Sequence, residues 1–457
     1  MSSKNLPLEI TAQILSQLPV KSLLRFKCVS KSWKTIIESP EFFKLHLKRA
    51  LKINYYNSSL ILKIYRTVTI NGSPTIVRAL YRAYLNLNDT KLNIRKVSLP
   101  PSFNTSLESI TMYKNYHINR PEKLVFGKIE VAGSCNGLVL IVSGINHIAV
   151  CNPALDQEQG SFKILPCINY CYYSYYYNAP DCHERSYWLS NGIRNYTAIR
   201  YFQFRVFGLG YDCISHCYKV ASLTAKRALI YTLLKDSRLW REINLPVFNN
   251  SYVVQPGNSE KKLFIKAHNH GIALNNHLHW HITEYDPLIF GYSKEMILNF
   301  DLHTEKWGEL AVPDELNKGY CLHDYISKPY IIELGMLNGC LCILISRGIS
   351  YDYLELWVMK VYGVKNSWEK LCNLPNGSGI PLVHRKEQQE FLLPGAQHGL
   401  GWYNLKEKRI RKVEFHGCEF TGEHYYSTSV KVCTESFVHP FTNMDGVEPE
   451  KMHQDGE

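Results

Sequence analysis

One short unit recurs six times along this chain and strongly limits the folds open to it. Each copy follows an apolar run and a polar turn. It begins with an aromatic or β-branched residue and usually ends in proline, as in "WREINLP" and "WGELAVP". The copies begin at Ile94, Phe162, Trp240, Trp307, Trp368 and Ile410, at spacings of 68, 78, 67, 61 and 42 residues. Repeats on this scale indicate an array or a propeller, and kelch-type blades repeat at roughly 50 residues.

The part of the chain that carries the repeats has the pattern of an all-β domain. Short apolar runs alternate with turns rich in Gly, Asn, Asp and Pro, and no long stretch shows the apolar periodicity of a helix. We therefore expect residues 51–440 to form a kelch-like β-propeller of about six to eight blades, because ring closure removes open sheet edges. The largest insertion is a Tyr-rich segment at 165–205, and we expect the polar acidic tail, 441–457, to be disordered.

Residues 1–50 differ, because their apolar residues recur at helical spacing. Ile10, Ile14 and Leu18 recur at i, i+4 and i+8 on one face of a predicted helix. Pro19 should end that helix, and Ser22 is placed to cap the next one. Helices this short are marginal in water on their own. The segment therefore predicts a small helical domain that cannot bury all of its apolar surface by itself.

Size and composition bound the possible functions. A chain of 457 residues predicts more than one module, and the absence of a run of 18 apolar residues predicts no membrane span. The N-terminus has no continuous apolar segment of the secretory kind, so we expect a cytoplasmic or nuclear protein whose 14 cysteines are reduced thiols. The net charge is +12, and residues 1–50 hold nine Lys/Arg against three Glu. Such a charge suits nucleic acid or an acidic protein surface.

The N-terminal segment "NLPLEITAQILSQLPVKSLLRFKCVSKSWKTIIESPEFFKLHL" resembles an F-box of the plant type. Downstream, "GSCNGLVLI", "FGLGYDCISHCYKV", "ILNFDLHTEKWGELAVP" and "LELWVMKVYGVKNSWEKL" are similar, in that order, to the plant F-box-associated domain. The resemblance covers nearly the whole chain apart from the Tyr-rich segment and the tail. Within the family, "YNLKEKRIRKVEFHG" near the C-terminus most resembles the S-locus F-box and S-locus-F-box-like proteins.

The resemblance implies a substrate-recognition subunit of an SCF-type cullin–RING ubiquitin ligase. The F-box would dock on a Skp-type adaptor, which links it to a cullin and a RING protein, and the propeller would hold a target protein. The chain would itself be no enzyme and need no cofactor, because the conjugating enzyme performs the transfer. The residues implied as adaptor-binding or F-box core are Leu6, Pro7, Ile10, Ile14, Leu15, Leu18, Pro19, Val20, Leu23, Leu24, Cys28, Val29, Ser30 and Trp33.

The Tyr-rich segment is a candidate for target contact, since tyrosine, tryptophan and arginine are the usual anchors of protein interfaces. The candidates are Tyr172, Tyr173, Tyr176, Arg185, Trp188 and Arg194. The alternative is a loop whose aromatic rings pack on the side of the propeller.

Other chemistries have weaker signals. His277, His279 and His281 alternate along one predicted strand, but no second ligand cluster accompanies them, so we expect no metal site. "FGLGYD" lacks the third glycine of a dinucleotide fingerprint. Two alternatives to the ligase subunit stay open. One is an RNA-binding propeller, which the net charge favours, although we do not expect nucleic acid as a partner. The other is a scaffold that acts outside a ligase.

Overall fold

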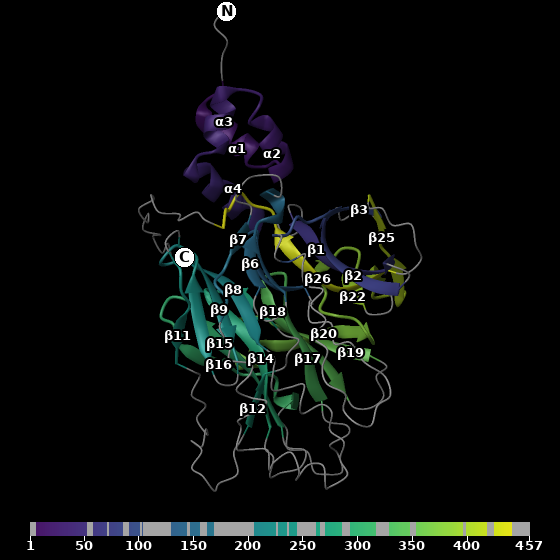
Figure 1. Ribbon diagram of the computed structural model, residues 1–457. Helices are drawn as coiled ribbons and strands as arrows, with labels where there is room; N and C mark the ends of the chain where they lie inside the picture. Colours follow the sequence, from purple (N-terminus) through teal and green to yellow (C-terminus); the bar gives the residue numbers. More distant parts are fainter. Residues whose placement is uncertain are drawn as a thin grey trace, which may run out of the picture.

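The computed structural model describes most of the chain. The described residues are 6–52, 58–70, 73–85, 91–100, 103, 129–143, 147–155, 162–168, 205–224, 227–234, 237–244, 262–265, 270–285, 293–316, 329–347, 353–395, 399–417 and 425–440. They form a helical N-terminal unit followed by an all-β domain (Figure 1).

Four helices make up the N-terminal unit: α1 (Leu8–Leu15), α2 (Val20–Phe26), α3 (Lys31–Ile37) and α4 (Pro40–Lys52). Pro19 occupies the N-cap position of α2, and its carbonyl accepts hydrogen bonds from the backbone N–H groups of Ser22 and Leu23. The prediction that Ser22 caps this helix is therefore wrong, because the extended conformation that precedes a helix falls on Pro19 instead. Ser30 caps α3 by accepting a hydrogen bond from the N–H of Trp33 at 3.1 Å.

The described strands form six sheets, antiparallel except for one pair at the edge of blade 1, and each sheet is a blade of a propeller. Blade 2 is β4 (Ile129–Cys135), β5 (Leu138–Ser143), β6 (His147–Cys151) and β7 (Phe162–Ile164). Blade 3 is β8 (Val206–Asp212), β9 (Cys217–Leu223), β10 (Ala228–Thr232) and β11 (Arg241–Ile243). Blade 4 is β12 (Lys262–Ile265), β13 (Ile272–Leu274), β14 (His277–Tyr285), β15 (Ser293–Asp301) and β16 (Trp307–Leu310). Blade 5 is β17 (Pro329–Leu337), β18 (Cys340–Arg347), β19 (Tyr353–Met359) and β20 (Trp368–Pro375). Blade 6 is β21 (Val383–Arg385), β22 (Glu390–Gly395), β23 (Gly399–Asn404) and β24 (Arg409–Lys412).

Blade 1 closes the ring with strands from both ends of the β-domain. It combines β1 (Ser58–Ile70), β2 (Ser73–Tyr84) and β3 (Lys91–Lys96) with β26 (Tyr425–Thr434), while β25 (Glu414–His416) runs parallel to β3 at its edge. β26 pairs with β1 and also contacts β4 of blade 2 and β22 of blade 6. The described strands thus form six blades, which lies within the expected range of about six to eight.

Five copies of the recurring unit fall on the outer strands β7, β11, β16, β20 and β24, and the copy in blade 1 falls on β3, next to the edge strand β25. Their tryptophans join neighbouring blades. The indole N–H of Trp240 donates to the Pro166 carbonyl at 2.8 Å, that of Trp307 to Asn244 at 2.7 Å and that of Trp368 to Ala311 at 2.9 Å. Each acceptor lies one or two residues past the outer strand of the preceding blade, so the repeat encodes a contact between blades.

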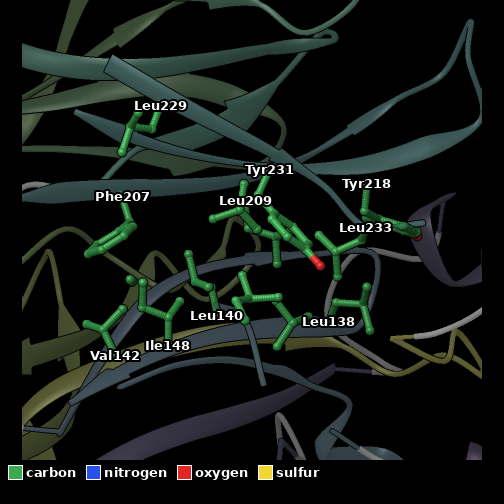
Figure 2. Packing of buried hydrophobic residues seen from close by; sticks show 14 of the residues in the cluster. Leu138, Leu140, Val142, Ile148, Phe207, Leu209, Tyr218, Leu229, Tyr231 and Leu233 are labelled. Carbon is green, nitrogen blue, oxygen red and sulfur yellow. The ribbon is translucent and has the colours of Figure 1, made fainter. Parts of the chain in front are cut away.

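The hydrophobic core of the propeller lies between blades, because each sheet is apolar on both faces. Between blades 2 and 3, Leu138, Leu140 and Ile148 pack against Phe207, Leu209 and Tyr231 (Figure 2). Equivalent buried clusters fill the other five interfaces. Tight hairpins join the strands: Asn136–Gly137 and Asn338–Gly339 have positive φ at both positions, which suits a two-residue hairpin turn.

Candidate protein-docking surfaces

The helical unit sits on one face of the propeller, over blades 1 and 2 (Figure 1). Its small core contains Leu15, Val20, Leu23, Ile37 and Phe42, together with two propeller residues, Leu155 and Phe437. Leu155 belongs to a short 3-10 helix, η1 (Pro153–Leu155), between β6 and β7, and Phe437 follows β26. Phe437 lies flat against Phe43, with ring centroids 5.6 Å apart, and its ring meets His46 edge-on at 5.3 Å.

Polar contacts join the same two parts of the chain. Arg82 on β2 donates to the Pro153 carbonyl at 2.7 Å and forms an ion pair with Glu435, whose side chain is 2% exposed. Asn152 donates to the carbonyls of Ser436 and Val438. Side chains of blades 1 and 2 therefore bind the segment after β26 through hydrogen bonds and an ion pair. The Phe437 side chain of this segment packs among the helices.

The residues implied by the F-box resemblance divide into two groups by exposure. Six contribute to the packed interior of the helical unit: Leu15, Leu18, Val20, Leu23, Leu24 and Trp33. The others are exposed: Leu6, Pro7, Ile10, Ile14, Pro19, Cys28, Val29 and Ser30. Pro7, Pro19 and Ser30 occupy N-cap positions and so shape the helices locally.

Exposed apolar side chains gather on α1 and beside it. Ile10 is 44% exposed and Ile14 49%, and their spacing of four residues places them on one side of α1, while Leu6, 61% exposed, lies just before the helix. Leu8, 60% exposed, is absent from the residues that the resemblance implies, although an apolar residue at the first position of an amphipathic helix is a readable signal. Val29, between α2 and α3, is 60% exposed. We call Leu6, Leu8, Ile10, Ile14 and Val29 the apolar stripe.

The cations of this segment do not all face solvent. Lys27 lies 3.6 Å from Glu38 within the helical unit, and the Lys21 ammonium lies 5.8 Å from the centre of the Tyr84 ring on β2. Arg25, Lys31 and Lys34 are exposed. The positive charge of residues 18–34 is thus divided between the surface of the helices and the contact with blade 1.

The described ends of the Tyr-rich segment lie on the opposite face of the ring from the helices. The turn Asn136–Gly137 touches Ser436 beneath the helical unit, so β4 ends on the helical side. Leu165, beyond the outer strand of blade 2, donates to the Ile148 carbonyl at the far end of β6, and β8 starts again at Val206. The six candidates for target contact, Tyr172, Tyr173, Tyr176, Arg185, Trp188 and Arg194, lie outside the described residues, as does the tail 441–457.

The histidines of β14 have partners inside the fold. His279 is fully buried, its Nδ1 lies 3.0 Å from the Ile272 carbonyl and its Nε2 lies 2.8 Å from the Tyr362 hydroxyl. Burial lowers the pKa of His279 to about 4, so the ring is neutral, donates to Ile272 and accepts from Tyr362. His281 is buried against Glu295. No group of three or more metal-ligating side chains occurs in the described part of the chain.

The described cysteines are free thiols. Cys433 on β26 is buried and Cys135 on β4 is partly buried, and desolvation raises the pKa of each thiol to about 12. Cys213 is exposed. Among the described residues, none of the helices combines the length and the apolar character that a bilayer crossing requires.

Comparison with known proteins agrees with this arrangement. Residues 4–45 match the F-box domain family, and residues 84–435 match the F-box associated beta propeller domain family. An Arabidopsis thaliana protein named F-box protein CPR1 is 24% identical over 459 residues, covering 94% of this chain and 89% of its own. An F-box/kelch-repeat protein of the same plant is 27% identical over 420 residues, covering 90% of each.

Proposed function

This chain belongs to the plant F-box proteins with an F-box associated β-propeller domain, and from that premise we propose that it is a substrate-recognition subunit of an SCF-type ubiquitin ligase. The helices bind a Skp-type adaptor, which connects the chain to a cullin and a RING protein, and the propeller binds the target. The chain contributes proximity and no catalytic group. We place this activity in the cytoplasm or nucleus.

The apolar stripe is the observation that carries the proposal. It places five large apolar side chains in water on a helical unit whose own core is already filled by Leu15, Val20, Leu23 and Phe437. Exposed apolar side chains such as Ile10 and Ile14 on one side of an amphipathic helix are typical of a surface that a partner covers. Burial of each such side chain contributes about 1.5–3 kcal/mol, so several together support a stable complex after association costs.

The structure also determines which substitutions test adaptor binding. Leu23 is fully buried, so an aspartate there would unfold the helices and leave the result ambiguous. Ile10→Asp with Ile14→Asp alters only the exposed stripe. Val361→Asp with Val364→Asp is the matched control, because these valines are 57% and 48% exposed on blade 5, far from the helices.

The experiment measures the affinity of the purified full-length protein for a plant Skp-type adaptor by calorimetry. The stripe variant should bind at least about 100-fold more weakly, since two lost apolar contacts remove about 3 kcal/mol, and the blade 5 variant should bind like the wild type. A wild type that does not bind, or a stripe variant that binds equally well, would refute the adaptor surface.

A second measurement separates the ligase subunit from the scaffold alternative. The full-length protein is captured from plant cells, and the co-purified proteins are identified. Recovery of both adaptor and cullin supports the ligase subunit, whereas adaptor without cullin in every preparation supports the scaffold.

A further inference from the structure

Four cations meet where the helical unit contacts blade 1, and we call them the joint cluster: Lys21, Arg25, Arg82 and Arg95. Lys21 and Arg25 are four residues apart on α2 and so lie on one side of that helix. Arg82 on β2 and Arg95 on β3 are directly paired across the strand ladder, so their side chains leave the same face of the sheet. Two separate parts of the fold therefore contribute two cations each.

Tyr84 lies at the centre of the joint cluster. The Arg82 guanidinium carbon is 4.5 Å from the centre of its ring, and the Lys21 ammonium is 5.8 Å from it. Partial burial and then the repulsion of Arg95, Arg25 and Arg82 hold the pKa of Lys21 below its ordinary value. The cations are thus close enough to act on one another, and the aromatic ring holds two of them in place.

Such an arrangement is unfavourable in isolation. Like charges directly opposite on neighbouring strands destabilise a sheet, and like charges four residues apart destabilise a helix. The nearby carboxylate of Glu435 is buried and already paired with Arg82. The five charges therefore sum to about +3, with Arg25 and Arg95 exposed and, within the described part of the chain, forming no ion pair.

Several other arginines on the propeller strands are matched with acids. Arg227 forms two hydrogen bonds with Glu242, and Arg385 pairs with Glu390 at 3.0 Å. The joint cluster departs from that pattern where α2 meets blade 1. Glu435 is the only carboxylate that the described part of the chain pairs with the joint cluster.

We propose that the joint cluster is a binding site for an acidic segment of a partner protein, with two or more carboxylates in sequence. Arginine side chains bind carboxylates through paired N–H groups, and cations spread over a helix and two strands suit several carboxylates along an extended segment. A nucleic acid fits less well, because bases bind by stacking on aromatic faces and the Tyr84 ring already has Lys21 and Arg82 against it.

The test uses the full-length protein and a fluorescent peptide that carries a run of glutamates between neutral flanks. A peptide of the same length with glutamine in place of glutamate controls for non-ionic binding. Arg25→Glu with Arg95→Glu reverses the two exposed cations of the joint cluster. Lys31→Glu with Lys34→Glu reverses two exposed cations on α3 and changes the net charge by the same amount. Arg95→Gln is a milder third variant, and circular dichroism verifies that each one folds.

The wild type should bind the glutamate peptide, more tightly at low than at physiological salt, and should bind the glutamine peptide at least about tenfold more weakly. The joint-cluster variant should lose at least about tenfold in affinity and Arg95→Gln a smaller factor, whereas the α3 variant should lose no more than about twofold.

Three outcomes would overturn the proposal. Equal losses in the two charge-reversed variants would mean that only the overall field attracts the peptide. Displacement of the peptide by inorganic phosphate alone at equal concentration would assign a small-anion site instead. Tighter binding of a single-stranded RNA than of the glutamate peptide, lost in the joint-cluster variant, would assign a nucleic-acid site.

Discussion

Removal of the Phe437 side chain tests whether the propeller completes the core of the F-box. Phe437 is 4% exposed and reaches from the segment after β26 into the helices, where it contacts Phe42, Phe43 and His46. The other buried propeller residue in this core is Leu155. The variant Phe437→Ala therefore leaves the F-box sequence unchanged and removes a large part of the surface on which its helices rest.

The expected loss of stability follows from this packing. Substitution of a buried phenylalanine by alanine costs about 3–5 kcal/mol, and the lower end applies here because helices at a joint can relax toward the space. A helical unit of about 45 residues rarely has stability to spare, since so small a domain buries too little surface. A loss of about 3 kcal/mol raises the equilibrium constant for local opening of the F-box by about 100-fold.

Hydrogen–deuterium exchange measures this opening region by region. Amides of α1 to α4 should exchange about 100-fold faster in Phe437→Ala, while the protected strands of blades 3 to 5 stay unchanged. Phe415→Ala is the matched control, because Phe415 is a partly buried phenylalanine on β25 that packs between blades 1 and 6. Exchange in α1 to α4 that is unaffected by Phe437→Ala, or affected equally by Phe415→Ala, would refute the reasoning.

Three further predictions concern titratable groups. Burial alone would raise the pKa of Glu355, but hydrogen bonds from Arg347, Lys370 and the Trp357 indole lower it to about 2. The ionised Glu355 therefore stabilises the folded protein by about 3 kcal/mol above the unfolded pKa of about 4.3, and this contribution is lost as the pH falls toward 2. In Glu355→Gln, the free energy of urea unfolding should accordingly vary less with pH in that range. His279 has its pKa lowered to about 4, so stability should fall by about 3 kcal/mol from pH 6.5 to pH 4, and by clearly less in His279→Asn. Iodoacetamide at pH 8 should alkylate Cys213 in the folded protein and leave Cys433 unmodified, as read by mass spectrometry; equal labelling would contradict the burial of Cys433.

The repeat made the propeller predictable, because its signal is local. The aromatic or β-branched residue that begins each copy marks the outer part of a blade, and Asn-Gly pairs mark hairpin turns whose positive φ few other residues tolerate. Six copies correspond to six blades, although the unequal spacing left the number open at six to eight. The same local reasoning failed at Ser22, where Pro19 begins the helix one turn earlier than a serine cap would.

The sequence by itself determined that an amphipathic helical unit precedes a ring of β-blades, and which residues are apolar in each. Only the tertiary structure decided that Leu15 and Leu23 are interior while Ile10 and Ile14 face water, and that Phe437, nearly 400 residues away, belongs to the core of the F-box. It also decided that Lys21 turns toward Tyr84 and joins arginines of another domain. The physical reason is that periodicity defines the faces of an element, whereas burial and charge balance depend on what the rest of the chain brings against each face.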